Sequence, residues 1–77
     1  MTTITLYTRP GCHLCEEARA LLLRAGRGLT VTIDEVNIDT DAALRARYDA
    51  RVPVAAIGGH ELDWPFTEAQ ARRLITA

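Results

Sequence analysis

The sequence contains no lysine, and its 9 basic residues are all arginines that are spread along the chain. The 10 acidic residues bring the net charge to −1. Nucleic-acid-binding domains concentrate positive charge on one face, and no basic patch stands out in this sequence. We therefore expect no nucleic-acid partner.

The sequence also lacks a long apolar run. No stretch approaches the roughly 18 apolar residues that a membrane-spanning helix needs. The first residues, MTTITLY, do not combine a charged segment with an apolar one, so no signal peptide is visible. We expect no membrane partner and a cytoplasmic location, where thiols are kept reduced and lasting disulfides are rare.

Cysteine is scarce, with only Cys12 and Cys15 among the 77 residues. Two cysteines cannot form the several disulfide or metal crosslinks that stabilise many small domains. The hydrophobic fraction of 48% is sufficient for a packed core without them. We expect one domain over residues 1–77, and we expect it to be a monomer.

The order of apolar and turn-forming residues predicts alternating strands and helices. Apolar residues alternate with polar ones in the first segment, recur at helical spacing in the second, and are largely β-branched in the third. Gly58-Gly59 predicts a tight hairpin, and Thr67 with Gln70 fits a helix capping box. The predicted strands are residues 3–8, 29–38, 54–57 and 60–63, and the predicted helices are residues 13–25, 41–48 and the segment after Thr67.

The element order β-α-β-α-β-β-α defines the expected architecture. A helix connects the first two strands, so they should be parallel, and the hairpin strands should be antiparallel. The apolar phase of the second strand slips between Ile33 and Val36, which predicts either a bulge or a late strand start. Thr40 is expected to cap the helix at 41–48. The fold class is therefore α/β, with a four-stranded mixed sheet and three helices.

The two cysteines lie where a strand meets a helix, in the segment YTRPGCHLC. With Cys12 as the N-cap, Cys15 falls in the first helical turn, close enough for a disulfide that opens and closes. Free backbone N–H groups and the helix dipole favour a thiolate at Cys12. Cys12 is then the expected nucleophile, and Cys15 the thiol that resolves a mixed disulfide.

Neighbouring charges modulate this expectation. A protonated imidazole at His13 would stabilise the Cys12 thiolate further, whereas Glu16 and Glu17 oppose that effect. We therefore expect the pKa of Cys12 to be moderately lowered.

Less reactive roles for the cysteine pair stay open. The pair could be half of a zinc site completed by His13 or His60, although zinc usually takes four ligands and the sequence has no second cysteine pair. It could also be a structural disulfide, which stabilises little across so short a loop, or two inert core cysteines. A Cys-x-x-Cys motif in a strand–helix–strand context favours redox chemistry over these alternatives.

Two long segments resemble a known family. LYTRPGCHLCEEARALL is similar to the active-site segment of glutaredoxins and related thioredoxin-fold proteins, and VNIDTDAALRARYDARVPV resembles their second strand, second helix and the Val-Pro segment that follows. The resemblance covers nearly the whole chain. It implies a minimal thioredoxin fold and a thiol–disulfide oxidoreductase with Cys12 and Cys15 as catalytic residues.

The resemblance also implies a substrate-binding groove. Pro53 matches the family's cis-proline, which faces the cysteines, although an ordinary trans proline at a strand start would read the same in sequence. Val52, the residue before it, would pair through its backbone with a substrate peptide. Arg9 matches a basic residue near the glutathione carboxylate, or is simply a solvated arginine. Tyr7 matches an aromatic residue near the active site, or is packed beneath a helix.

One segment departs from the family pattern. Where glutathione-using members have a Gly-Gly-x-Asp-like segment, this chain has ELDWPF. Asp63 could substitute in part for the missing aspartate. Trp64 and Phe66 resemble the Trp-x-x-Phe-like segment of small glutaredoxin-like proteins that thioredoxin reductase reduces, or they pack against the last helix. The chain thus resembles an outlying branch that lacks the usual glutathione-binding segment.

We therefore expect an electron carrier that reduces protein or small-molecule disulfides with no bound cofactor and no metal. The electrons would come from glutathione, or from NADPH through a reductase such as thioredoxin reductase. The alternative is a non-enzymatic binding module, or a protein that holds a metal or an iron–sulfur cluster through Cys12.

Overall fold

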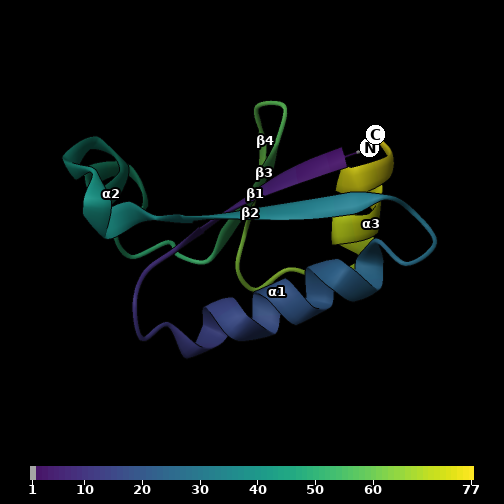
Figure 1. Ribbon diagram of the computed structural model, residues 1–77, viewed down its shortest axis with the longest axis horizontal. Helices are drawn as coiled ribbons and strands as arrows, with labels where there is room; N and C mark the ends of the chain where they lie inside the picture. The colour runs from purple at the N-terminus through teal and green to yellow at the C-terminus, as the bar shows by residue number, and fades with distance from the viewer. Residues whose placement is uncertain (1) are drawn as a thin grey trace.

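A four-stranded mixed sheet in the order β2-β1-β3-β4 forms the centre of the molecule (Figure 1). The computed structural model describes residues 2–77. The expected element order and the α/β class of a minimal thioredoxin fold are confirmed. The elements are β1 (Thr2–Thr8), α1 (His13–Ala25), β2 (Val31–Asn37), the 3₁₀ turn η1 (Ile38–Thr40), α2 (Ala42–Tyr48), β3 (Val54–Ile57), β4 (His60–Asp63) and α3 (Glu68–Thr76).

The strand pairing follows the predicted directions. β1 runs parallel to β2, and β1–β3 and β3–β4 are antiparallel. The hairpin turns at Gly58 and Gly59, whose φ angles of +53° and +90° favour glycine. The β1–β2 register is uninterrupted, so β2 has a late start at Val31 and no bulge. The phase slip arises because Ile33 packs on the α1 side, whereas Val36 pairs with Tyr7 on the opposite face.

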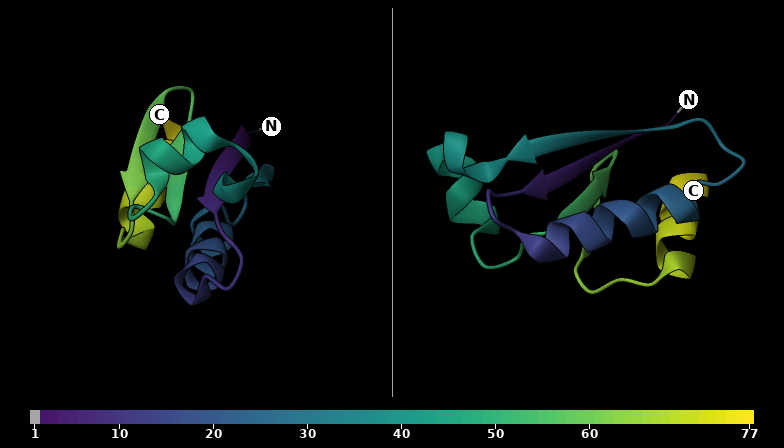
Figure 2. Two further views of the ribbon diagram at one scale, coloured as in Figure 1. Left: turned by 90° about the vertical axis from the view of Figure 1, so that its left-hand side faces the viewer. Right: turned by 60° about the horizontal axis from the view of Figure 1, so that its bottom comes forward.

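The helices divide the core between the two faces of the sheet. α1 lies along one face, and α3 crosses near its C-terminal end (Figures 1 and 2). The buried residues of this main core are Ile4, Leu6, Ala18, Leu22, Ala25, Ala55, Phe66, Ala71 and Ile75. A smaller core of Ile38, Tyr48 and Val54 lies between the other face and α2. Its partly buried neighbours are Tyr7, Leu44 and Val52.

Local capping signals fix most of the helix starts. The Thr67–Gln70 capping box of α3 is present in full. The prediction that Thr40 caps α2 is wrong, because Asp41 holds that position and its Oδ1 accepts the N–H groups of Ala43 and Leu44. Thr40 instead ends η1, where its hydroxyl donates to a backbone carbonyl. A carboxylate with two acceptor oxygens is a strong cap, so the helix begins one residue later than predicted.

Across residues 2–77, the structure has no helix with the length and apolar character required to span a membrane.

Candidate active site

The Cys12–Cys15 pair occupies the first turn of α1. Cys12 is the N-cap, and its Sγ lies at disulfide distance from that of Cys15, with the two Cα atoms 5.3 Å apart. The Cys15 N–H donates to the Cys12 Sγ at 3.2 Å. Cys15 is 5% exposed, whereas Cys12 is only partly buried. The pair thus has one accessible sulfur and one sulfur that faces the core.

A tight loop carries Cys12 from the end of β1 to the start of α1. Gly11 turns the chain with a φ of +76°, a value that side chains rarely allow. The Cys12 N–H donates to the Arg9 carbonyl at 3.2 Å. These contacts hold Cys12 at the helix terminus, where a thiolate is stabilised by backbone N–H groups and by the helix dipole.

An open groove of about 680 Å³ begins at the cysteines and follows one side of α1. Its walls include Gly11, His13, Glu16, Arg19, Leu23 and Glu35. Arg19 Nε and Glu35 Oε2 lie 3.5 Å apart, so these two charges are paired. Cys12 thus lies at the wall of an open groove.

His13 points toward solvent rather than toward the sulfur atoms. Its side chain is 83% exposed, and its ring nitrogens lie 3.9 Å from carboxylate oxygens of Glu16 and Glu17. A positive charge on the imidazole would therefore interact with these carboxylates. The influence of His13 on Cys12 stays a prediction.

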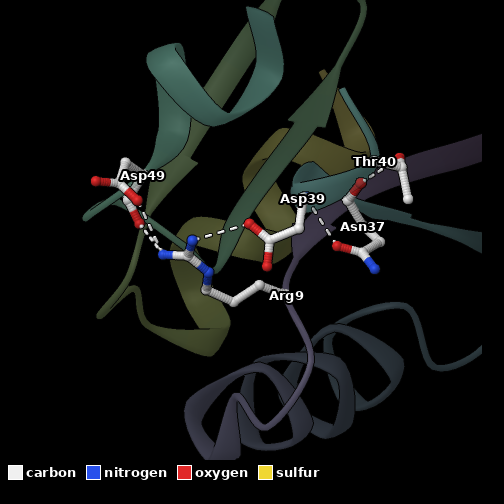
Figure 3. A network of polar contacts seen from close by, with 5 residues as sticks. All are labelled: Arg9, Asn37, Asp39, Thr40 and Asp49. Carbon is white, nitrogen blue, oxygen red and sulfur yellow. Dashed lines mark hydrogen bonds and ion pairs between the residues drawn. The ribbon is translucent and has the colours of Figure 1, made fainter. Parts of the chain in front are cut away.

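Arg9 is held by two aspartates (Figure 3). Its Nη2 donates to Asp39 Oδ1 at 2.9 Å, and its Nη1 donates to both Asp49 Oδ1 and the Asp49 carbonyl at 3.0 Å. The hydrogen bonds to Asp39 and then Asp49 raise the pKa of Arg9. The guanidinium is thus already paired with two aspartates of the same chain, and its contact with a glutathione carboxylate stays a prediction.

The Val52-Pro53 peptide bond is cis, as the resemblance implies, and Pro53 is buried. The Val52 N–H donates to the Tyr48 carbonyl at 3.2 Å. The Pro53 carbonyl accepts from the Trp64 N–H at 3.2 Å. An extended substrate would therefore have the Val52 carbonyl, rather than its N–H, as its backbone partner. The substrate-pairing role of Val52 stays a prediction.

Asp63 and Trp64 lie where β4 leaves the sheet. Arg51 donates to Asp63 Oδ1 at 2.8 Å and to Oδ2 at 3.3 Å, so the Asp63 carboxylate is already paired. Trp64 meets Phe66 edge to face, with ring centroids 5.1 Å apart, and packs against the main core. Packing is therefore one role of both aromatic residues. Trp64 also keeps some exposed surface, and docking there stays a prediction.

A polar network on the α2 side of the sheet has no signal in the sequence. The Tyr48 hydroxyl donates to Glu61 Oε2 at 2.6 Å, and its ring stacks on Tyr7 with centroids 4.2 Å apart. Tyr7 thus packs beneath α2. Arg51 Nη2 donates to Glu61 Oε1 at 2.9 Å. The hydrogen bond from Tyr48, followed by that from Arg51, lowers the pKa of Glu61. Burial, followed by the bond to Glu61, raises the pKa of Tyr48.

Metal-ligating side chains do not cluster in the described part of the chain. Across residues 2–77, no group of three or more histidine, cysteine, aspartate or glutamate residues is placed to hold a metal ion. His60, considered above as a zinc ligand, lies on β4 beside the hairpin turn.

Two of the comparisons with known proteins give matches. Residues 3–76 match the family model of the glutaredoxin-like domain. Among solved structures, the chain is similar to the "X-ray structure of Northeast Structural Genomics target protein XcR50 from X. campestris". The two chains are 45% identical, the alignment covers 91% of each, and the TM-score is 0.79. No curated protein matches the chain.

Proposed function

The chain belongs to the glutaredoxin-like domain family, and from that premise we propose that it is a thiol–disulfide oxidoreductase that reduces protein or small-molecule disulfides. Family membership and a cysteine pair at disulfide distance indicate a redox-type function. The observation that carries the finer proposal is the asymmetry of the pair. Cys12 opens to the groove and accepts a backbone N–H, whereas Cys15 is buried.

The asymmetry supports a different role for each sulfur. The Cys12 thiolate attacks one sulfur of the substrate disulfide, which forms a mixed disulfide and releases the first substrate thiolate. Cys15, as its thiolate, then attacks the Cys12 sulfur and releases the second. The two substrate thiolates take up two protons in total. Two electrons have passed to the substrate, and the protein is left oxidised by two electrons, with a Cys12–Cys15 disulfide.

Regeneration needs an external reductant that returns two electrons. Two glutathione molecules could supply them and leave as glutathione disulfide. NADPH could supply them through thioredoxin reductase, with the exposed part of Trp64 in the docking surface. The dithiol itself carries the electrons, so the reaction needs no bound cofactor.

Substrate chains would be held beside Cys12 by the segment before β3. The Val52 carbonyl offers one backbone acceptor, and the buried Pro53 fixes the direction in which it points. Strand-like pairing of this kind gives affinity through backbone bonds with little dependence on substrate sequence. Protein disulfides in extended segments fit this site.

Cysteine substitutions test the proposal. The oxidised chain, given NADPH with either thioredoxin reductase or glutathione plus glutathione reductase, should recover two free thiols. Cys12→Ser should abolish disulfide reduction, and Cys15→Ser should accumulate a mixed disulfide that intact-mass spectrometry detects. Normal reduction by both variants, or no thiol recovery with either donor, would overturn the proposed function.

A further inference from the structure

Arg9 joins the cysteine loop to two other elements. Its carbonyl accepts the Cys12 N–H at 3.2 Å, and its guanidinium reaches Asp39 in η1 and Asp49 just after α2. The three residues come from segments that are 30 and 40 positions apart in the sequence. The Arg9 side chain therefore connects the loop that carries Cys12 to η1 and to the residue just after α2.

Further hydrogen bonds fix the backbone around Asp39, and Asp49 offers two acceptors to Arg9. The Asp39 N–H donates to Asn37 Oδ1 at 2.9 Å, and the Thr40 hydroxyl donates to the Asn37 carbonyl at 2.8 Å (Figure 3). Asp49 presents both its carboxylate and its backbone carbonyl to the same Nη1. A planar guanidinium suits such a fixed set of acceptors better than a lysine ammonium does.

The charged groups around Cys12 determine how the pairing of Arg9 affects a Cys12 thiolate. The charged and titratable groups that line the groove with Cys12 are Arg9, His13, Glu16, Arg19 and Glu35. Arg19 and Glu35 are paired with each other, and His13 lies against Glu16 and Glu17. Arg9 would therefore be the main cation that stabilises a Cys12 thiolate if the two aspartates did not pair with it.

We propose that Arg9 is a positioning residue that fastens the Cys12 loop to η1 and α2, while Asp39 and Asp49 hold its charge away from the Cys12 sulfur. The three side chains carry a combined charge of −1, so they stabilise the thiolate less than a free arginine would. This inference rests on the proposed function, because it assigns the regulation of the same nucleophile. The network thereby sets how readily Cys12 ionises.

The test follows the rate of Cys12 alkylation by iodoacetamide from pH 5 to 9 in the full chain carrying Cys15→Ser. D49N frees part of the Arg9 charge and should lower the pH midpoint of alkylation by about 0.3 unit or more. R9Q removes the cation and should raise it by a similar amount, as expected for unit charges acting through solvent. If Arg9 only held the loop in place, both variants would shift the pH midpoint in the same direction, or neither would shift it. That result would overturn the proposal.

A double-mutant cycle separates the route through Arg9 from a direct effect of the aspartate. D49N should shift the midpoint less in the R9Q background than in the Arg9 background. Equal shifts in the two backgrounds would mean that Arg9 transmits nothing, which would also overturn the proposal. D39N repeats the cycle from η1 if a variant at position 49 does not fold.

Matched controls come from the exposed Arg24–Glu68 pair, whose atoms lie 3.2 Å apart in another part of the molecule. R24Q and E68Q make the same changes of charge and should leave the midpoint where it is. Shifts as large as those of R9Q and D49N would assign the effect to overall charge and would sink the inference. The readout needs no reductase and no substrate disulfide, so it is independent of whether the chain turns over. Failure of the proposed function would appear in thiol recovery instead.

Discussion

Replacing Tyr48 with phenylalanine removes one hydroxyl from a buried site and leaves the ring in place. The hydroxyl donates to Glu61 Oε2 at 2.6 Å, and the side chain belongs to a residue that is only 3% exposed. The stacking on Tyr7 needs only the ring, so Tyr48→Phe preserves it. The substitution therefore isolates the hydrogen bond to the carboxylate.

The expected loss of stability follows from the type of bond. A hydrogen bond to a charged group contributes about 1.5–3 kcal/mol. Glu61 keeps its partners Arg51 and Arg47, so no buried charge is left alone and the lower end of the range applies. We expect a loss of about 1.5 kcal/mol at pH 7. For a domain of this size that corresponds to a fall in Tm of about 6–12 °C.

The pH dependence gives a second, independent check. Because folding lowers the pKa of Glu61, the stability that it contributes is present above its unfolded value and is lost as the pH falls through the folded one. A protonated Glu61 still accepts a hydrogen bond, but a weaker one. The difference in stability between the wild-type chain and Tyr48→Phe should therefore shrink as the pH falls through the lowered pKa of Glu61.

Urea unfolding at 25 °C, followed by far-UV circular dichroism on fully oxidised chains, measures both quantities. Glu61→Gln and Glu68→Gln form a matched pair, because each removes an arginine-paired carboxylate. Glu61 is 22% exposed and Glu68 is 55% exposed, so only Glu61→Gln should be clearly destabilising. A loss below about 0.5 kcal/mol for Tyr48→Phe at pH 7, or a loss that does not change with pH, would refute this reasoning.

Three further predictions concern other parts of the chain. Gly26→Ala would place a Cβ 2.8 Å from Val31 Cγ2, so urea unfolding should show a loss of about 1–3 kcal/mol that Val31→Ala partly restores in the same chain. Arg72 donates to the carbonyl of Ala25, the last residue of α1, at 3.0 Å and to that of Arg27 just beyond it at 2.8 Å. Arg72→Ala should therefore cost about 1 kcal/mol of stability, seen as a lower urea midpoint with an unchanged m-value. Because carboxylates lie near Cys12, the chain should reduce the cationic disulfide cystamine faster than the anionic disulfide dithiodipropionate at low salt. The difference between the two rates should shrink at high salt. Glu16→Gln should weaken that preference and Glu68→Gln should not; an unchanged rate ratio in Glu16→Gln would contradict the charge explanation.

Features encoded within a few neighbouring residues could be predicted from the sequence. The break at Pro10-Gly11 and the helical spacing after it place Cys12 at the start of α1, where the structure has it. The hairpin at Gly58-Gly59 and the capping box at Thr67 are equally local, because each depends on residues within one turn. These signals suffice for the element order, and the element order fixes the sheet directions.

Contacts between distant polar residues could not be predicted in this way. Arg9 meets Asp49 across 40 positions, and Tyr48 meets Glu61 across 13. Hydrophobic periodicity reports which side of an element is buried, but it does not report which polar groups face each other once the elements pack. The incorrect prediction of Thr40 as the cap of α2 has a related cause. Thr40 and Asp41 both favour caps, but Thr40 is the last residue of η1, so the cap falls on Asp41.

The central position of β1 in the sheet has a consequence for how the chain is made. β1 leaves the ribosome before the other three strands, yet its neighbours are β2 and β3, and the last of its β3 partners, Ala56, comes 48 residues after Thr8. At about 5–20 residues per second, translation from Cys15 to the end of β3 takes roughly 2–8 s. During that interval both cysteines have been synthesised, but the sheet that buries Cys15 is not yet complete. Nascent chains therefore display an unprotected dithiol, and a polypeptide that stops short of β3 would leave it so.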